Sequence, residues 1–407
     1  MPHVTAMGTY LPCWGARHSR VAGPDEDAVT LAVEAGRAAL GGGEPVERVV
    51  LVSRELPLVD SANAAVLLAG LGLDPELEVV ERLGGAPATL DALSSARPRT
   101  LVIGVDLEPA GAAAAWVGEH GGLQVRTTAR VSRSLPVRTR NATGVHDYGD
   151  PRLLRERGLV ASLSAAWLDV PVAVAGVDHD QAAALCRTSP PRVPTTGASS
   201  ALFALAAMAE WETAGLLVGV EQASLSGVTV SAGPVGVARV EPAARELPET
   251  VYEPGDDLPL SLAAYDRAFE AKVRWEAGRF AGSDDLDFPP RYRLGPDGTL
   301  ATDYTLVPLP RTGTVYTQTT VRLPVPGLES PYTLVIVELD GVGVRALARV
   351  TGADAGTARI GTRGRMVLRR GAVRSGVPDY GYAFEPDTDG LVPGPQAADG
   401  ANGEEAA

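Results

Sequence analysis

The residues best suited to chemistry lie in short stretches where predicted helices begin. The turn Gly-Gly-Ala-Pro at 84–87 stands between an apolar strand candidate, 77–80, and a helix of small residues. Such a turn often holds a cysteine or serine nucleophile, whose negative charge the helix dipole stabilises. Two interpretations stay open: a nucleophile site without its reactive atom, or an ordinary strand-to-helix turn. Neither predicts covalent catalysis at Gly85 or Ala86, because their side chains cannot accept an acyl group.

Two further stretches carry groups that could act on a substrate. His179 stands between two aspartates before a predicted helix. It could act as a base or polarise a carbonyl group, or it could be an ordinary first residue of a helix. Thr195, Thr196 and Gly197 open another helix. Its backbone N–H groups could hold a thioester oxygen or a phosphate, although capping by threonine explains the same residues.

The cysteines exclude several classes of site. The chain has only Cys13 and Cys186, too few for a disulfide framework or a four-cysteine zinc site. We therefore expect no metal, a reducing compartment and an incidental loop thiol at Cys13. The first residues lack the regions of a signal peptide, and no apolar run approaches the roughly 20 residues that span a bilayer. These features predict a cytoplasmic protein with no membrane contact.

Apolar strands and helices alternate through the first half of the chain. Consecutive valines, leucines and isoleucines predict buried strands at 48–53, 100–105 and 216–220. Further strands are expected at 4–10, 170–177 and 228–240, the last as a closing hairpin or strand pair, and helices at 28–40, 61–71, 159–168, 178–186 and 194–213. The arginine-rich stretch 126–140 is a solvated strand or loop, or else a specific anion site. This alternation predicts a layered α/β domain with a mainly parallel core.

The composition changes near residue 242, where prolines space out an acidic linker. An amphipathic helix is expected over 260–280, and beyond it about five short strands suit a small barrel. The last residues offer no apolar content to bury. We predict four segments: an α/β domain at 1–245, a linker with its helix at 246–283, a barrel at 284–385 and a disordered tail at 386–407.

Several of these stretches together resemble the thiolase superfamily, in particular hydroxymethylglutaryl-CoA synthases and ketoacyl-ACP synthase III. The resemblance covers the opening strand, the first helix, the strand after the glycine turn and two later loops, at 4–12, 27–40, 101–106, 172–185 and 196–202. The second half resembles the OB-fold, zinc-ribbon proteins that accompany bacterial thiolases, at 313–321, 331–340 and 359–361. The resemblance implies a truncated thiolase-like layered α/β domain followed by a small all-β OB-fold barrel.

The departures from the family pattern concern its chemistry. The position of the family's cysteine nucleophile falls on Gly85 or Ala86, and the asparagine that would polarise a thioester carbonyl is replaced by Thr195. His179 is the match for the family's histidine. The segment 289–298, where the OB-fold family often has zinc-binding cysteines, has none.

Arginines gather in the predicted barrel, among them Arg345 and Arg349. They could contact the phosphates of coenzyme A or close over a partner's tunnel, they could bind nucleic acid as OB-folds often do, or they could be a solvated edge. Aromatic residues for base stacking are few, and the net charge of −14 opposes contact with a phosphate backbone. We expect no nucleic-acid partner.

The chain resembles these families but lacks their cysteine nucleophile, their asparagine and their zinc-binding cysteines. This combination predicts a pseudoenzyme connected with lipid metabolism. We expect a non-catalytic subunit that pairs with an active thiolase or ketoacyl synthase and helps to bind or channel an acyl thioester. The resemblance implies no cofactor. The ligand that it implies is a coenzyme A thioester. Pairing is implied because thiolase-like domains dimerise through a central sheet. Two alternatives stay open. One is an active enzyme, an acyltransferase or a retro-aldolase (a C–C bond lyase), that acts on acyl-CoA through His179 without a cysteine. The other is a purely structural homodimer.

Overall fold

The computed structural model divides the chain into two compact units, Met1–Leu247 and Pro248–Ala407. Each unit is considered by itself. The residues that the structure describes are 1–41, 45–58, 61–133, 135, 138–141, 143–148, 150–166, 169–255, 270–290, 293–294, 297–374 and 376–387.

The first unit alternates strands and helices, as the sequence predicts. Its elements are β1 (His3–Tyr10), β2 (Trp14–Ala16), β3 (Ser19–Val21), α1 (Ala28–Leu40), β4 (Arg48–Ser53), α2 (Ala64–Leu71), β5 (Glu78–Leu83), α3 (Ala86–Ser94), β6 (Thr100–Leu107), β7 (Ala110–Gly118), β8 (Leu123–Ser132), β9 (Arg138–Asn141), β10 (Gly144–Asp147), the π-helix η1 (Leu153–Val160), α4 (Ala161–Ala166), β11 (Ala173–Ala175), α5 (His179–Leu185), α6 (Ser200–Glu210), β12 (Gly215–Glu221), β13 (Ser224–Val230) and β14 (Gly236–Val240).

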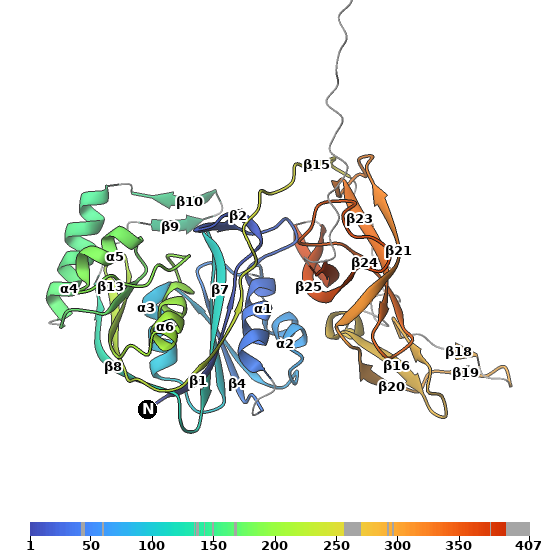
Figure 1. The fold of residues 1–407 in the computed structure, drawn as a ribbon, viewed down its shortest axis with the longest axis horizontal. Helices are drawn as coiled ribbons and strands as arrows, with labels where there is room; N and C mark the ends of the chain where they lie inside the picture. Colours follow the sequence, from blue (N-terminus) through green and yellow to red (C-terminus); the bar gives the residue numbers. More distant parts are fainter. Residues whose placement is uncertain are drawn as a thin grey trace, which may run out of the picture. The chain divides into compact units, whose positions relative to one another are not determined.

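One long mixed sheet folds around two of these helices. Its strands follow the order β11-β12-β13-β8-β1-β7-β6-β4-β5, and β14 pairs with β1 outside this path. β8 and β1 share only two residue pairs, His3–Gln124 and Val4–Leu123, so the sheet divides there into two halves. α3 and α6 lie between the halves, α1 and α2 cover one outer face, and α4 and α5 cover the other (Figure 1). The unit therefore has five layers.

The two halves repeat one arrangement. In the first half, β4 pairs in parallel with β6, β6 antiparallel with β7, and β7 antiparallel with β1. In the second half, β11, β12, β13 and β8 pair in the same sequence of directions. α3 directly precedes β6, and α6 directly precedes β12. The two central helices are thus equivalent elements of an internal repeat.

Small side chains allow the layers to approach closely. All nine residues of β7, Ala-Gly-Ala-Ala-Ala-Ala-Trp-Val-Gly, are buried, although alanine has a low preference for strands. In β1, a Cβ on Gly8 would clash with the backbone of Ala35 and Ala39 in α1. The sequence analysis assigned no element to Ala110–Gly118, because its residues have a low strand propensity. The segment is a strand because it is buried between helices.

The sheet corrects two expectations. The core is mixed rather than mainly parallel, because β6 and β7 are joined by Glu108 and Pro109 alone, and so short a link joins antiparallel neighbours. The expected closing pair over 228–240 is also wrong. β13 pairs with β8 and β12, whereas β14 crosses to pair in parallel with β1.

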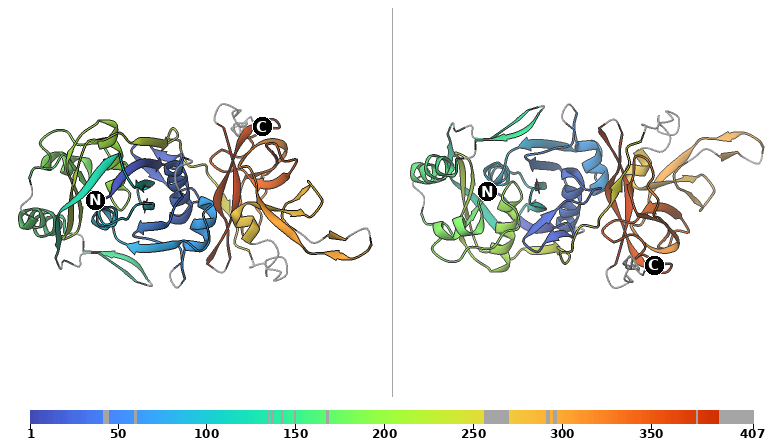
Figure 2. Two further views of the ribbon diagram at one scale, coloured as in Figure 1. Left: turned by 90° about the horizontal axis from the view of Figure 1, so that it is seen from below. Right: turned by 90° about the horizontal axis from the view of Figure 1, so that it is seen from above.

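The second unit is all-β in its named elements. They are β15 (Val251–Tyr252), β16 (Glu276–Phe280), β17 (Leu286–Asp287), β18 (Arg293–Leu294), β19 (Leu300–Ala301), β20 (Tyr304–Pro308), β21 (Thr312–Val321), β22 (Glu329–Ser330), β23 (Tyr332–Leu339), β24 (Arg345–Arg349), β25 (Arg363–Arg374) and β26 (Val377–Pro386). The β18–β19 hairpin projects from the rest of this unit (Figures 1 and 2).

Five of these strands form the barrel that the sequence predicts. The sheet runs in the order β24-β23-β21-β25-β26. Val350, directly after β24, bridges in parallel to Phe384 of β26, and the N–H of Thr351 donates to the Phe384 carbonyl at 2.9 Å. These contacts join the two edge strands, so the sheet closes on itself. The fold class, a layered α/β domain followed by a small all-β barrel, is confirmed.

Residues 260–269 of the predicted amphipathic helix and the tail after residue 387 lie outside the described residues, whereas residues 270–274 are helical as predicted. The last residues of the expected helix form β16 instead, which is a correction. β16 pairs with β20, and Trp275 and Ala277 pack in the barrel core, so the burial of this segment favours a strand.

The start of α1 gives a prediction about stability. The Asp27 carboxylate accepts hydrogen bonds from the N–H groups of Val29 and Thr30, both at 3.0 Å. Replacement by alanine, Asp27→Ala, leaves these groups without their partner and should lower the free energy of unfolding by about 1 kcal/mol in urea titrations. Asp25→Ala, two residues earlier, is the control and should change it little. Equal effects of both variants would contradict the capping role.

Candidate functional site

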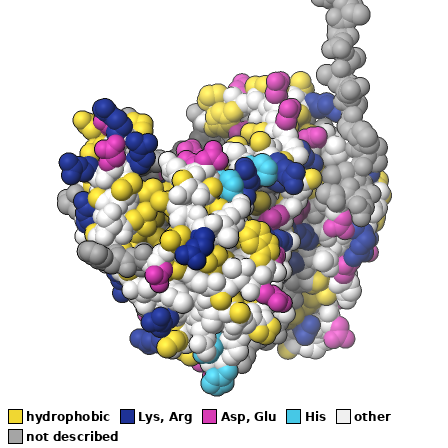
Figure 3. Space-filling model, turned by 60° about the vertical axis from the view of Figure 1, so that its left-hand side comes forward, with side chains coloured by type: hydrophobic (Ala, Val, Ile, Leu, Met, Phe, Trp, Pro, Cys, Tyr) yellow, Lys and Arg dark blue, Asp and Glu magenta, His cyan; other side chains and the backbone are white. Residues whose placement is uncertain are grey.

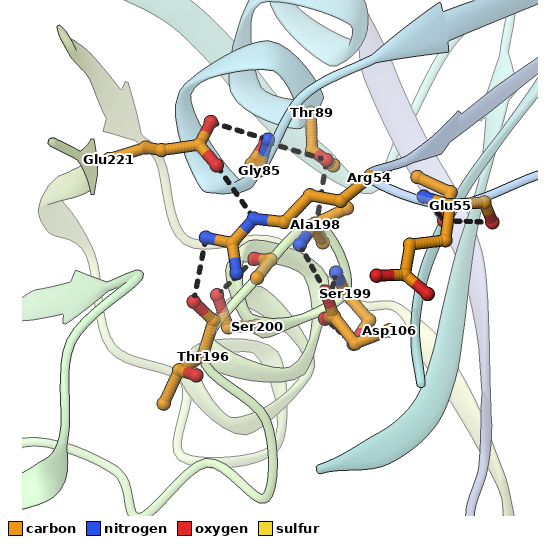
Figure 4. Close-up of polar contacts among 12 residues, drawn as sticks. Arg54, Glu55, Gly85, Thr89, Asp106, Thr196, Ala198, Ser199, Ser200 and Glu221 are labelled. Atoms are coloured by element: carbon orange, nitrogen blue, oxygen red, sulfur yellow. Dashed lines mark hydrogen bonds and ion pairs between the residues drawn. The ribbon is translucent and has the colours of Figure 1, made fainter. Parts of the chain in front are cut away.

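A glutamate from β12 occupies the N-terminus of α3. One carboxylate oxygen of Glu221, at the end of β12, accepts the N–H of Gly85 at 2.7 Å. The other accepts Nε of Arg54, which follows β4, at 2.6 Å (Figure 4). The helix dipole favours a negative charge at this position. The place where the sequence analysis sought a nucleophile therefore holds an internal ion pair.

The ion pair also explains the glycine. A Cβ on Gly85 would lie 2.8 Å from Glu221 Oε1 and 2.9 Å from an Arg54 guanidinium nitrogen. The φ angle of Gly85 is −102°, which most residues can adopt. A side chain at Gly85 would therefore require the ends of the Glu221 and Arg54 side chains to shift. Ala86, the other candidate position, is fully buried in the core around α3 and α6.

An aspartate from β6 occupies the N-terminus of α6 in the same way. Asp106 accepts hydrogen bonds from the N–H of Ala198 at 2.8 Å, the N–H of Ser199 at 2.9 Å and the Ser199 hydroxyl at 2.6 Å. A Cβ on Gly197 would clash with this carboxylate. Asp106 is only 6% exposed. Burial raises its pKa, and the hydrogen bonds from Ser199 and Ala198 and the charge of Arg54 oppose that rise.

The two carboxylates are related by the internal repeat. β6 follows α3 and its Asp106 binds the start of α6, whereas β12 follows α6 and its Glu221 binds the start of α3. Further polar contacts join the same loops. The Thr89 hydroxyl donates to the Ala198 carbonyl at 2.8 Å, and Arg54 donates to the Thr196 carbonyl at 3.3 Å. Each half of the unit therefore caps the central helix of the other.

A cavity of about 310 Å³ opens beside the Arg54–Glu221 pair. This volume lies at the lower end of the range for small-molecule sites. The described residues that line it are Arg54, Asp147, Pro151, Arg155, Leu159, Gly176, Val177, Gln181, Thr196, Val220, Glu221 and Gln222. They include no cysteine, serine or histidine. The cavity can hold a small polar ligand, and among its described lining residues Thr196 supplies a hydroxyl group.

The three residues predicted to open a helix are placed differently from one another. Thr196 lines the cavity, and Gly197 lies against Asp106. Thr195 is buried and shares a hydrogen bond of 2.8 Å with the Ser199 hydroxyl. Threonine does not cap α6, which corrects that interpretation. Ser199 is the N-cap residue, and its side chain makes no capping bond but donates its hydroxyl to Asp106.

His179 is the first residue of α5, on an outer layer. Asp178 caps this helix by accepting the N–H of Gln181 at 2.8 Å. The Nδ1 atom of His179 is shielded from solvent and has no hydrogen-bond partner among the described residues. His179 is absent from the described lining of the cavity, whereas Gln181 belongs to it. A catalytic role for His179 stays a prediction.

Arg345 and Arg349 lie in the second unit, on β24. Arg345 pairs with Glu338 at 2.8 Å and lies 3.6 Å from the ring centre of Tyr316. Arg349 lies 4.9 Å from the ring centre of Tyr332. Both guanidinium groups therefore have local partners on the barrel surface. Their predicted contact with coenzyme A stays a prediction.

Neither cysteine is among the described residues that line the cavity beside Glu221. Burial raises the pKa of Cys186, which disfavours the reactive thiolate. Cys13 is buried, and its sulfur accepts a contact of 3.6 Å from Arg245. In the described part of the chain no three His, Cys, Asp or Glu residues gather as a metal site would require. Among the described helices, none has the length and apolar character needed to cross a membrane.

The sequence analysis missed Arg54 and Glu221 and gave Asp106 no role. One signal could have found the two carboxylates. Each stands at the end of a buried strand, at the edge of the sheet where the central helices begin. An acidic residue there is well placed to bind a helix N-terminus. Arg54 gave no comparable signal, because its contacts join residues far apart in the sequence.

Comparison with known families supports the fold of the second unit. Residues 306–369 match the family model described as the C-terminal OB-fold domain of ChsH2. This interval includes β21, β23 and β24. No curated protein sequence matches the chain.

Solved structures give distant matches to a little over half of the chain. 3-Oxoacyl-(acyl carrier protein) synthase III, FabH, from Pseudomonas aeruginosa PAO1 aligns with 57% of this chain over 98% of its own, at 17% identity and a TM-score of 0.43. OleA from Xanthomonas campestris aligns with 56% of this chain over 98% of its own, at 14% identity and a TM-score of 0.47. The HMG synthase of the curacin biosynthetic pathway aligns with 58% of this chain over 80% of its own, at 15% identity and a TM-score of 0.42. We take nothing about activity from likeness at this level.

The buried carboxylate gives a prediction about pH. The pKa of Asp106 is raised in the folded protein, so the folded state binds this proton more tightly than the unfolded state does. The stability that Asp106 contributes is complete below its unfolded pKa of about 3.9 and falls as the pH rises through the folded pKa. In the Asp106→Asn variant this titration is absent. We expect the difference in free energy of unfolding between wild type and variant to shrink as the pH rises.

Urea unfolding from about pH 4 to pH 7 measures this difference. Asp25→Asn is the control, because Asp25 is not part of the α6 contact network. A difference between wild type and Asp106→Asn that stays constant or grows with pH would contradict the raised pKa.

Proposed function

We propose that this protein is a non-catalytic thiolase-like and OB-fold subunit. In this proposal it pairs with an active thiolase or ketoacyl synthase and helps to bind or channel an acyl thioester. The observation that supports it most directly is the filled space at Gly85. A nucleophilic side chain at this position would collide with the Arg54–Glu221 ion pair.

The loss of covalent chemistry is supported at both central helices. The N–H groups that could stabilise a negatively charged intermediate already donate to Glu221 and Asp106. A thioester carbonyl would have to displace a carboxylate from these positions. Charge-assisted hydrogen bonds are roughly twice as strong as neutral ones, so the neutral carbonyl competes poorly.

A role in binding remains compatible with this arrangement. The cavity beside Thr196 brings Arg54 and Arg155 to one polar space next to the capped α3. Together with the sequence resemblance to thiolases, this supports an acyl thioester as the ligand class. An acyltransferase or retro-aldolase that works without cysteine is the alternative that the first test below separates.

The edge strand β5 supports pairing with another chain. Among the described residues β5 pairs only with β4, so its other edge presents free backbone groups. Edge strands of this kind add strands from other chains readily. Leu83, at the end of β5, is 73% exposed. An open edge on the long sheet is the surface through which we propose that the partner docks.

The first test concerns covalent chemistry. Wild-type protein incubated with radiolabelled acyl-CoA should carry no thioester-linked adduct in intact-mass analysis. A stable adduct on Cys13 or Cys186, or turnover of the thioester that depends on His179, would favour the enzyme alternative. The Gly85→Cys variant should also stay unacylated, and its collision with Glu221 should cost about 1–3 kcal/mol of stability in urea unfolding.

The second test concerns the partner. Tagged protein purified from its native host should recover a thiolase-superfamily chain that retains its cysteine, and the complex should lose at least half of that partner in Leu83→Asp. Leu294→Asp is the matched control, because Leu294 is similarly exposed, at 76%, but belongs to the second unit. Recovery of a homodimer alone would favour the purely structural alternative.

A further inference from the structure

A second and larger cavity lies elsewhere in the first unit. Its volume is about 540 Å³, within the range of small-molecule sites. The described residues that line it are Leu11, Arg17, His18, Arg20, Arg192, Pro194, Phe203, Ala207, Arg239, Glu241, Pro242, Ala243 and Ala244. They come from the β2–β3 hairpin, the segment before α6, α6 itself and the end of β14. We call this cavity the basic pocket.

The charge of the basic pocket is strongly one-sided. Four arginines and one histidine face a single glutamate among its described lining residues. This contrasts with the formal net charge of −14 for the chain. Basic and acidic side chains are interspersed over most of the face shown in Figure 3. An excess of positive charge in one pocket of an acidic protein therefore calls for an explanation.

One of the four arginines is already neutralised. Arg239 makes two bonds of 2.7 Å to Glu210 and a third of 2.7 Å to Glu241. The bonds to Glu210 are the main cause of a raised pKa for Arg239. Glu241 is thereby engaged as well. The charge of Glu241 also acts on Arg20, where it opposes the lowering of the pKa by burial.

Arg20 is buried and makes no salt bridge with a described residue, although the charges of Cys13 and Glu241 act on it. It is 5% exposed, and its terminal nitrogens donate to the carbonyls of Pro12 at 2.9 Å and Pro242 at 2.7 Å. Its Nε is shielded from solvent and has no hydrogen-bond partner in the described part of the chain. A buried charge is costly unless an opposite charge accompanies it. Burial accordingly lowers the pKa of Arg20.

Arg17 and Arg192 complete the positive cluster. Both are exposed, and within the described residues neither forms an ion pair. Arg17, Arg20 and Arg192 thus form no salt bridge with a described residue while lining one cavity. Guanidinium groups match the oxygens of phosphate in paired hydrogen bonds. With Arg239 paired to Glu210, these three positive charges face the one negative charge of Glu241 in the described lining, and the excess suits an anion with two charges.

We propose that the basic pocket binds the diphosphate group of a phosphorylated ligand. Arg17, Arg20 and Arg192 supply the charges that balance it, and Phe203 with Leu11 supplies an apolar wall for the attached group. A free nucleoside diphosphate and the nucleotide part of coenzyme A both carry this group. The site is separate from the cavity beside Glu221, because the two share no described lining residue.

Calorimetric titration of the full chain with inorganic pyrophosphate tests the site. We expect one molecule to bind per chain with a dissociation constant below about 1 mM, more weakly as the ionic strength rises. Arg17→Glu and Arg192→Glu should each weaken binding by roughly tenfold or more. Arg97→Glu is the matched control, because Arg97 is exposed and lies between α3 and β6, outside the pocket. It should bind as the wild type does.

Titrations with ADP and with coenzyme A then separate the two sources of the diphosphate. Tighter binding of ADP than of coenzyme A assigns the site to a nucleotide, and the reverse order assigns it to coenzyme A. Absence of saturable pyrophosphate binding to the wild type overturns the proposal, as does equal binding by wild type, Arg17→Glu and Arg192→Glu. Thermal unfolding of each variant checks that the fold is intact. These outcomes do not depend on whether a partner docks at β5.

Discussion

The first unit depends on two carboxylates that each hold the start of a central helix. Asp106 and Glu221 accept backbone N–H groups that would otherwise point into the middle of a layered domain without a partner. A buried N–H without a partner costs about 1–3 kcal/mol. The negative charge of Glu221 at the start of α3 can contribute up to about 2 kcal/mol, whereas burial raises the pKa of Asp106 and disfavours its charged form. Each carboxylate lies at the end of a strand in one half of the sheet and binds the start of a helix in the other half. These contacts connect the two halves in both directions.

This arrangement is difficult to reconcile with covalent acyl chemistry at the same place. A helix N-terminus can stabilise a reacting anion only if its N–H groups are unoccupied. Here the α3 terminus binds Glu221, and the ion pair with Arg54 fills the volume that a side chain on Gly85 would need. Stability and reactivity compete for the same donors, as is common in active sites. In this chain the donors serve stability.

Charge in the first unit is distributed according to whether a group has a partner. Arg54 and Arg239 form short ion pairs with Glu221 and Glu210, and both pairs join segments distant in the sequence. Arg20, by contrast, is held by backbone carbonyls alone. Carbonyl groups fix the position of a guanidinium group without cancelling its charge. Arg20 lines the basic pocket together with Arg17 and Arg192, and this excess of positive charge supports the anion site proposed above.

The sequence by itself determined the order of most elements and the absence of a nucleophile at Gly85, because hydrophobic periodicity, capping residues and residue identity are local properties. It also indicated the barrel, whose alternating strands lie close together in the chain. Only the tertiary structure decided that alanine-rich β7 is a strand, that β14 crosses to β1, and that Asp106 and Glu221 cap helices of the opposite half. These outcomes depend on contacts between residues about 90 to 230 positions apart, and no local pattern encodes such a pairing. The empty turn was therefore visible in the sequence, whereas the ion pair that fills it became visible only in the fold.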